Sequence, residues 1–588
     1  MILWDWLKQE FIHNSAMALR RFPLTLAYSA VTVALIIYAV EMHHSEMDIY
    51  RFVLTASLGV PLSFAVSIYA ERQELKTIAR VLSHAIIGCI LISFCIFFLP
   101  QKPYLAAIIR FALVAALVHV WVAFAAYPRD SSQNAFWQFN RSLFLRFAVA
   151  SLFSGILYLG LTIALVSIDA LIGIKIEGKR YSELFFVCAG IIHPWFFLAG
   201  IPRNLDTEVD VYPPALRIFT QYILIPLVAL YLLILYVYSA KVIFQWEWPR
   251  YKATYLVGLF SAPGILAALL LFPLSASEWV KKYTKILFVS LIPLVLMMLI
   301  CVYRRVIEHG VTEMMVIAIA MGIWLLFIAT YTLATRGNNM RAIPVSLALF
   351  LLAISFGPLS APSLGQSSQT TRLKAILVTA GLPEGRITPS ATKKIRLPYL
   401  AYSEMVNKSR YLTDHFGAEG LLPFIQGDRD VLLLRTGGDS KERRTGYEAH
   451  NFFINHFENT EPAKQSYHGY RTYAIKNTVL NIKGFRRLIH RQIYRSDKPS
   501  EFLVENYRIT VNWQTGIFSV KHNESTGQVN FSTLYETLQH EHSEKESPLP
   551  QTSLTRNFRL GQQKARIVFM HISGEKDVRE IEFNLLLP

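Results

Sequence analysis

The chain has 588 residues, of which 53% are hydrophobic and only 17% are charged. This composition is too apolar for an ordinary soluble protein, yet not apolar enough for a chain that lies in a membrane throughout. The formal net charge of +17 comes largely from the basic bias of membrane loops. Because the sequence has no recognisable nucleic-acid-binding motif, we expect no nucleic-acid partner.

The first 22 residues have the pattern of a helix that lies at the membrane interface. Four apolar side chains leave the charged ones on other faces of such a helix, namely Leu3, Trp6, Leu7 and Phe11. The charges are dispersed, and no small-residue cleavage site follows a short apolar core. We therefore expect residues 1–22 to be an uncleaved interfacial segment rather than a signal peptide.

Apolar runs of membrane-spanning length dominate residues 23–361, and none remains beyond Ser360. A helix needs about 20 apolar residues to cross the roughly 30 Å hydrocarbon core of a bilayer. We predict eleven spans, near residues 23–40, 52–70, 81–99, 104–127, 144–172, 182–200, 215–243, 253–273, 284–303, 310–334 and 340–360. The predicted fold is a polytopic α-helical membrane protein with a C-terminal soluble α+β domain.

The seventh predicted span is too long for a straight crossing. Residues 215–249 would measure about 50 Å as one helix at roughly 1.5 Å per residue. We predict a kink at Pro226 and a stop at Pro249. The rings of Trp246 and Trp248, in "WEWPRY", are typical of the headgroup layer where such a span leaves the membrane.

Lysine and arginine residues in the short loops predict the orientation of the spans. Fourteen lie on the side of the N-terminus: Lys8, Arg20, Arg21, Arg72, Lys76, Arg80, Arg129, Arg141, Arg203, Lys281, Lys282, Lys285, Arg336 and Arg341. Nine lie on the other side: Arg51, Lys102, Lys175, Lys179, Arg180, Arg250, Lys252, Arg304 and Arg305. The excess predicts a cytoplasmic N-terminus and, with an odd number of spans, an extracytoplasmic C-terminal domain.

From residue 361 the sequence changes character. We predict a polar linker in "APSLGQSSQT", then helices in "TRLKAILVTAG" and "YLAYSEMVNKSRYLTDHFG". Strand-like alternation marks "FLVENYRITVNW", "GIFSVKH", "KARIVFMHI" and "VREIEFNLLL", whereas "EHSEKESPLPQTS" is expected to be a loop. A stretch of this size can bury a core, so we expect residues 362–588 to form a soluble α+β domain.

Polar side chains within the spans are the best candidates for a functional site, because each costs free energy in hydrocarbon unless it is paired or hydrated. The candidates are His193, Arg110, His119, Gln221 and Asp169. They include no cluster of acids, which weakens the case for a cation-coupled mechanism.

His193 lies near the middle of the sixth span and precedes Pro194, whose missing N–H frees a backbone carbonyl. A histidine beside a free carbonyl suits a proton relay or a ligand contact. The simpler alternative is a packed histidine that bonds to the next helix. In either case we expect the ring to face other helices or a cavity rather than lipid.

The remaining polar candidates have ordinary explanations. Arg110 and His119 are nine positions apart on one helix, so they lie on opposite faces and should not share a site. Arg110 can snorkel to the interface, and Gln221 is expected to bridge helices. Asp169 and Glu313 lie close to span ends, where the interface explains them.

Motifs of known chemistry are missing from the sequence: there is no P-loop, H-E-x-x-H, G-x-S-x-G, C-x-x-C or G-x-G-x-x-G. We therefore assign no catalytic, cofactor-binding or metal-ligating residue. The "HEH" at residues 540–542 is expected to belong to a polar loop, and the "DRD" at residues 428–430 to a turn. All four cysteines fall in predicted spans, so the soluble domain has none to form disulfides.

Two basic clusters in the C-terminal region could contact anionic lipid headgroups, but a solvated surface is the favoured explanation. They are Lys393, Lys394 and Arg396, and Arg486, Arg487 and Arg491.

Four stretches together resemble a bacterial multi-pass membrane family known as domain of unknown function 4153. They are "RRFPLTL", "VYPPALRIFTQYILIPLVALYLLILYVYSAKVIFQWEWPR", "GPLSAPS" and "RLKAILVTAGLPEGRITP". The resemblance implies a membrane location and a multi-pass architecture, but no activity and no catalytic residue.

These observations favour a bacterial inner-membrane protein that acts in envelope transport or maintenance without an enzymatic site. The bilayer is then its first partner. The alternative is a membrane-anchored sensor or scaffold whose soluble domain binds a partner. An enzyme with a lipid-linked substrate would require a cluster of acids or histidines formed only in three dimensions.

Overall fold

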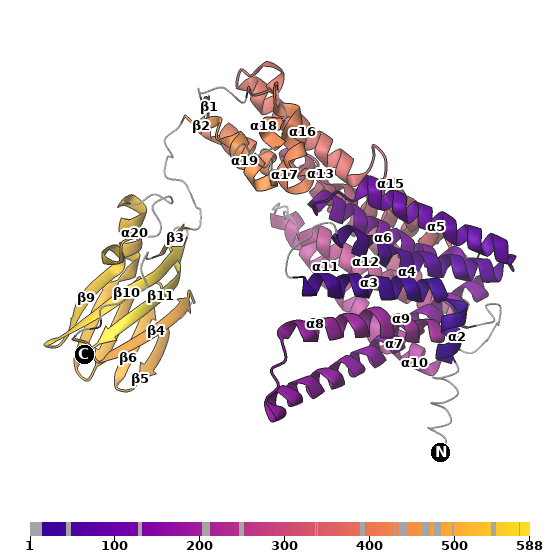
Figure 1. Cartoon of the computed structure of the whole chain (residues 1–588), viewed down its shortest axis with the longest axis horizontal. Coiled ribbons are helices and arrows are strands. Elements are labelled where there is room, and N and C mark those ends of the chain that lie inside the picture. Colours follow the sequence, from indigo (N-terminus) through magenta and orange to yellow (C-terminus); the bar gives the residue numbers. More distant parts are fainter. Residues whose placement is uncertain are drawn as a thin grey trace. The chain divides into compact units, whose positions relative to one another are not determined.

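The structure is a computed structural model of the chain (Figure 1). It describes residues 14–42, 49–127, 132–202, 212–245, 252–335, 337, 339–388, 394–427, 430–433, 445–460, 471–474, 482, 484–496, 499–541, 549–574 and 577–588. The chain divides into two compact units, Met1–Thr460 and Glu461–Pro588. The expected domain boundary at 361/362 thus lies inside the first unit.

The first unit is helical. Its membrane-region helices are α2 (Asn14–Arg21), α3 (Pro23–Glu41), α4 (Ile49–Arg72), α5 (Thr77–Phe98), α6 (Leu105–Ala125), α7 (Gln133–Ser167), α8 (Gly178–Val187), α9 (His193–Ala199), α10 (Pro214–Ile218), α11 (Ile225–Gln245), α12 (Lys252–Leu270), α13 (Glu278–His309), α14 (Glu313–Thr335) and α15 (Ala342–Ser355). Short π-helical segments join some of them: η2 (Ile168–Ile172), η3 (Cys188–Ile192) and η4 (Phe219–Leu224).

Nine spans in the described part of the chain are long and apolar enough to cross a membrane: Pro23–Glu41, Ile49–Arg72, Thr77–Phe98, Leu105–Ala125, Gln133–Ile172, Gly178–Ala199, Pro214–Gln245, Glu278–His309 and Glu313–Thr335. Two further predicted spans correspond to shorter apolar helices, Leu256–Leu270 and Ala342–Ser355. The chain is therefore a multi-pass helical membrane protein, and the count of eleven crossings remains a prediction.

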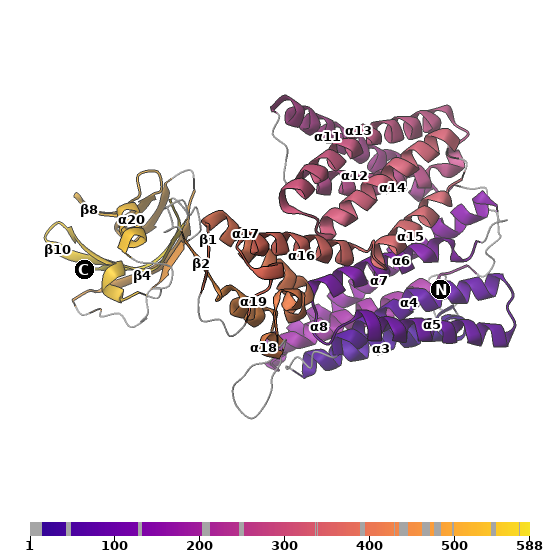
Figure 2. The ribbon, with the colours of Figure 1, turned by 90° about the horizontal axis from the view of Figure 1, so that it is seen from above.

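Helices that follow one another along the chain mostly pack side by side. Contacts join α11 to α12, α12 to α13, α13 to α14, α14 to α15, α15 to α6, and α6 to α4, which also packs on α3 and α5. Figure 2 shows α11 to α14 gathered on one side and α3 to α5 on the other, with α15, α6 and α7 between them. One of the cavities described below lies between α12 and α14 of the first group and the helices α6, α7 and α15.

Prolines explain two of the π-helical segments. A proline has no N–H to donate, and its ring clashes with the carbonyl four residues earlier, so the helix widens just before it. Pro194 follows η3, where His193 N donates to Cys188 O five residues back. Pro226 follows η4 in the same way, which places the irregularity of the long seventh span where the sequence predicted a kink.

The predicted linker "APSLGQSSQT" is wrong, because these residues form the first half of α16 (Ala361–Thr379). The Ser360 hydroxyl accepts a bond from Ser363 N and caps this helix, and its small residues allow close packing. The other elements up to residue 460 are η6 (Pro383–Gly385), β1 (Ile395–Leu397), α17 (Tyr399–Phe416), η7 (Ala418–Phe424), α18 (Asp430–Leu433), α19 (Gly446–Ile454) and β2 (Phe457–Asn459). Among them lies an apolar core that includes Leu377, Met405, Leu412 and Phe453.

The second unit is a β-sheet domain. Its elements are β3 (Arg471–Ala474), β4 (Arg487–Tyr494), β5 (Ser500–Val504), β6 (Tyr507–Asn512), β7 (Ile517–His522), β8 (Ser525–Asn530), α20 (Phe531–Glu541), η9 (Gln551–Leu554), β9 (Thr555–Leu560), β10 (Gln563–Gly574) and β11 (Val578–Leu587). One sheet has the order β3-β10-β11-β4 with β9 on β10, and the other has the order β5-β6-β7-β8. The rings of Phe518 and Phe583 join the two sheets edge to face, with centroids 4.9 Å apart.

The predicted strands are confirmed in β6, β7, β10 and β11, whose buried side chains fill this core, but "FLVENYRITVNW" forms two strands, β5 and β6, joined by a turn at residues 505–506. The predicted helices are also confirmed as α16 and α17. "WEWPRY", residues 1–13, His542 and residues 428–429 lie outside the described residues. Asp430 begins α18 rather than completing a turn.

Candidate functional site

His193 is half-buried and bonded to a neighbouring helix. Its Nε2 lies 3.1 Å from the Ser151 hydroxyl of α7, and the Phe147 ring packs edge-on at 5.0 Å. The carbonyl that Pro194 frees belongs to Gly190, and it accepts a hydrogen bond from the buried Ser29 hydroxyl of α3. Because another residue satisfies that carbonyl, it provides no relay partner for His193.

His119 and His193 line one cavity of about 470 Å³ together with Thr25 and several apolar side chains. The Nδ1 atom of His119 lies 2.7 Å from Ala115 O in its own helix. The two histidines belong to different predicted spans, so their positions in the sequence do not indicate a common site. Their shared cavity is lined by residues of α3, α4, α6, α7 and α9.

The other predicted candidates lie apart from this cavity. Arg110 donates from Nε to Ser355 O at 3.2 Å, and its guanidinium lies over the Phe98 ring at 5.1 Å. Gln221 accepts from Arg217 Nε one turn earlier, at 3.4 Å, a contact within one helix and not a bridge to another. Asp169 is half-buried in η2.

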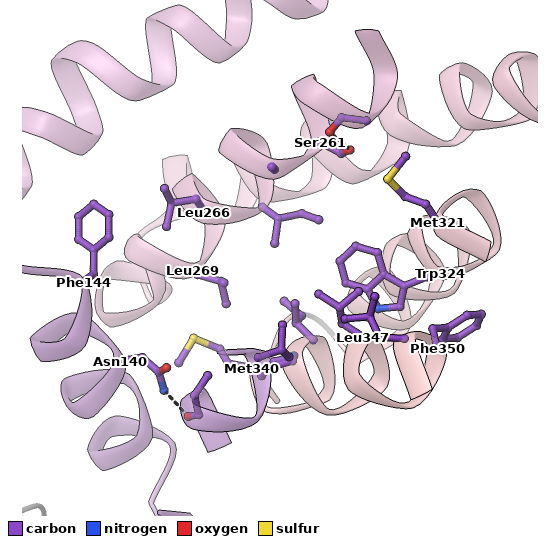
Figure 3. A pocket seen from close by; sticks show the side chains of 18 of the residues that line it. Asn140, Phe144, Ser261, Leu266, Leu269, Met321, Trp324, Met340, Leu347 and Phe350 are labelled. Atoms are coloured by element: carbon purple, nitrogen blue, oxygen red, sulfur yellow. Dashed lines mark hydrogen bonds between the residues drawn. The ribbon is translucent and has the colours of Figure 1, made fainter. Parts of the chain in front are cut away.

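A larger cavity lies among α6, α7, α12, α14 and α15, with a volume of about 540 Å³ (Figure 3). We call it the apolar cavity. Its walls are mostly aliphatic and aromatic, including Phe144, Leu266, Leu269, Met321, Trp324, Met340, Leu347 and Phe350. The volume lies within the range of roughly 300–1,000 Å³ that is usual for ligand pockets.

Most polar groups in the walls of the apolar cavity are engaged by the helices themselves. The Asn140 amide nitrogen donates to Ala123 O at 3.0 Å and to Phe136 O at 2.9 Å. Ser261 donates to Val257 O at 2.8 Å. In the same way, Trp324 Nε1 donates to Ser346 Oγ at 3.1 Å. Groups bonded in this way have little left to offer, so the cavity presents mainly hydrocarbon to a ligand.

Arg141 is the exception in these walls. Its guanidinium lies over the Trp137 ring, 5.3 Å from the centroid. Its Nε is buried and has no hydrogen-bond partner in the described part of the chain. A buried donor of this kind is costly unless an acceptor reaches it.

A second polar site, missed by sequence analysis, surrounds Glu313 at the start of α14. Glu313 is only 1% exposed, so a position at the interface does not explain it. Its carboxylate accepts a hydrogen bond from the Tyr411 hydroxyl, and His415 Nδ1 lies 2.8 Å from its other oxygen. Burial, together with the adjacent carboxylate, raises the pKa of Tyr411 well above its usual value.

The turn between α13 and α14 is held by α16 and α17. Arg372 donates to three of the last carbonyls of α13, at 3.2, 2.6 and 3.0 Å, those of Val306, Ile307 and Glu308. Lys408 donates to His309 O at 2.6 Å, and Gln369 donates to Val311 O at 2.8 Å. These bonds satisfy carbonyls that a helix end leaves unpaired. We call residues 306–313 and these partners, with Tyr411 and His415, the polar junction.

A sequence signal for the polar junction exists only in part. Lys408, Tyr411 and His415 follow one another at spacings of three and four on α17, so they share a helix face. Nothing in that spacing identifies Glu313 as the partner.

Comparison with known proteins gives a family but no activity. The family described as "Domain of unknown function (DUF4153)" matches residues 24–375. The uncharacterized protein PM1469 of Pasteurella multocida (strain Pm70) is 23% identical over 487 residues, which cover 82% of this chain and 79% of that protein. No solved structure matches.

Proposed function

This chain belongs to the DUF4153 family, and from that premise we propose that it acts in transport or maintenance of the bacterial envelope by binding a lipid-like molecule in the apolar cavity. The observation that carries this proposal is the cavity itself, whose polar groups are mostly bonded to the surrounding helices. An apolar pocket of ligand size among membrane helices suits an acyl chain, because transfer of hydrocarbon from water into an apolar pocket is favourable.

The proposed location is the bacterial inner membrane with a cytoplasmic N-terminus, as the loop charges predict. The bacterial relative supports the location. Reporter fusions after Arg341 and after Pro588 test the orientation, using a phosphatase that is active outside the cytoplasm and a fluorescent protein that folds inside it. The proposal requires opposite sides, so two reporters active on one side would contradict it.

The test of the apolar cavity is a substitution that fills it. Leu266→Trp adds a ring to the cavity wall, whereas Leu259→Trp adds the same ring to a position on α12 that is 73% exposed. In purified protein, we expect Leu266→Trp to weaken binding of a fluorescent acyl-chain probe at least about tenfold, since a filled pocket cannot admit it. Equal binding by both variants would contradict the proposed function.

A second candidate function is a sensor or scaffold, because residues 461–588 form a compact unit of their own. The polar junction joins α16 and α17 to the membrane helices, so the informative deletion begins after Thr460. A scaffold should lose all function on that deletion. A lipid-binding carrier should still bind the acyl-chain probe after the deletion. If the truncated protein folds but no longer binds the probe, the apolar cavity alone is not sufficient for binding.

A further inference from the structure

A second cavity of about 510 Å³ adjoins the apolar cavity. The two share three lining residues, Leu269, Met340 and Ile343. The second cavity is built from the end of α12, the beginning of α13, the end of α14 and the beginning of α15. We call it the basic cavity.

The walls of the basic cavity differ chemically from those of the apolar cavity. Lys281 and Lys285 are four residues apart on α13, so both can point to one face, and Thr284 and Thr332 add hydroxyls. Lys281 donates to Glu278 Oε1 at 2.8 Å, but Glu278 is 82% exposed and does not line the cavity. Lys285 has no ion pair within the described part of the chain.

No acidic residue is among the described lining residues of either cavity. The buried, unpartnered Nε of Arg141 lies in the wall of the apolar cavity. Gln133, at the start of the same helix α7, accepts from Met340 N at 3.2 Å, so this end of α7 is tied to the wall that the two cavities share. An electropositive pocket is thus contiguous with a hydrocarbon one.

We propose that the two cavities together bind one amphiphile, an acyl lipid with an anionic phosphate headgroup. The acyl chain occupies the apolar cavity, and the phosphate occupies the basic cavity beside Lys281 and Lys285. Ammonium and hydroxyl donors match the several acceptor oxygens of a phosphate, and such charge-assisted bonds are stronger than hydrogen bonds between neutral groups. This inference rests on the proposed function and names the class of ligand for the same site.

The experiment compares two lipids with the same acyl chains, phosphatidic acid and phosphatidylcholine, each fluorescently labelled and titrated into full-length protein in a neutral maltoside detergent. We expect phosphatidic acid to bind at least about tenfold more tightly, because choline screens the phosphate that the lysines would bind. The double variant Lys281→Gln/Lys285→Gln should lose most of this preference, and Lys281→Arg/Lys285→Arg should keep it.

Lys282→Gln is the matched control, since Lys282 lies between the two cavity lysines in sequence and lines neither cavity. It should retain the full preference for phosphatidic acid. Equal binding of the two lipids, or a Lys282→Gln effect as large as that of the double variant, would overturn the headgroup assignment. Displacement of the labelled lipid by inorganic phosphate at equal concentration would show a free-phosphate site and would also overturn it.

The variants separate this inference from the function on which it rests. If Leu266→Trp weakens both lipids and the lysine substitutions change nothing, only the headgroup assignment fails. If the Leu266→Trp protein binds both lipids as tightly as the unmodified protein does, both the headgroup assignment and the proposed function fail.

Discussion

The polar junction and the apolar cavity both involve α14, yet they are built in opposite ways. In the junction, a buried carboxylate and the carbonyls at the end of α13 have donors on α16 and α17. In the cavity, most polar groups bond to their own or to neighbouring helices, and about 540 Å³ of space is left. The polar junction, with its hydrogen bonds made and its space filled, allows one arrangement of side chains, whereas the apolar cavity has room for a ligand.

The tightness of the junction is visible at Gly365 on α16. A Cβ atom there would lie 2.7 Å from the Tyr411 hydroxyl, 3.2 Å from Glu313 Cδ and 3.3 Å from Glu313 N. Substitutions in the polar junction should therefore destabilise the fold, whereas substitutions in the apolar cavity should weaken binding.

The largest effect is expected for Glu313→Leu. The substitution leaves the buried Tyr411 hydroxyl without its acceptor and removes the partner of His415, so we expect a loss of about 3 kcal/mol of unfolding free energy. Thermal unfolding in detergent, followed by intrinsic fluorescence, measures the loss. The control is Glu308→Leu, at a carboxylate that is 69% exposed, where we expect a change within about 0.5 kcal/mol. Equal losses would mean that the buried Glu313 carboxylate stabilises the fold no more than the exposed Glu308 carboxylate of the same junction.

The next effect is expected for Gly365→Ala. The added methyl group must displace the Tyr411 hydroxyl and crowd the backbone of Glu313, which should cost about 2 kcal/mol. Gly155→Ala in α7 is the control, because a Cβ atom there meets nothing within 4 Å and alanine favours a helix. A Gly365→Ala protein as stable as the Gly155→Ala protein would contradict tight packing in the junction.

A smaller, pH-dependent effect is expected at His450, which lies in the core between α17 and α19. Burial, with help from nearby Arg410 and against Asp414, lowers the pKa of His450, and Ser409 Oγ lies 3.2 Å from its Nδ1. Between the folded-state and unfolded-state pKa values, His450 therefore binds a proton in the unfolded chain but not in the folded chain. Its contribution to stability is full above a pH of about 6.5 and is lost as the pH falls from there through the folded-state pKa.

His450→Gln should flatten the dependence of unfolding temperature on pH between about pH 7 and pH 5. His309→Gln, at a histidine side chain that is 50% exposed, should keep the slope of the unmodified protein. The prediction fails if both variants show the same slope.

The smallest effect on stability is expected for Leu266→Trp, although its effect on ligand binding should be large. The cavity has room for the ring, so the unfolding free energy should change by no more than about 1 kcal/mol. Thermal unfolding of the same preparations used for probe binding provides the measurement. A loss as large as that of Gly365→Ala would mean that the cavity wall is as rigid as the junction.

Local sequence patterns located the elements of this protein that depend on neighbours in the chain. Hydrocarbon requires a contiguous apolar run with its backbone bonds closed inside the helix, so hydropathy locates spans such as α5 and α13 closely. Alternation located β6 and β11 for the same local reason, and Pro194 marked the irregular helix at His193. The His193 ring indeed bonds to a neighbouring helix, at Ser151.

The contacts between residues distant in the sequence depend on how whole helices pack. The Ser29 hydroxyl reaches Gly190 O across 161 residues, and Tyr411 reaches Glu313 across 98. The polar stretch after Ser360 forms the first half of helix α16 because it packs in the polar junction, although its composition is typical of a linker. The apolar and basic cavities are spaces left by four or more helices. Local patterns specify which residues need a partner, but packing of whole helices decides which partner, or which ligand, can reach them.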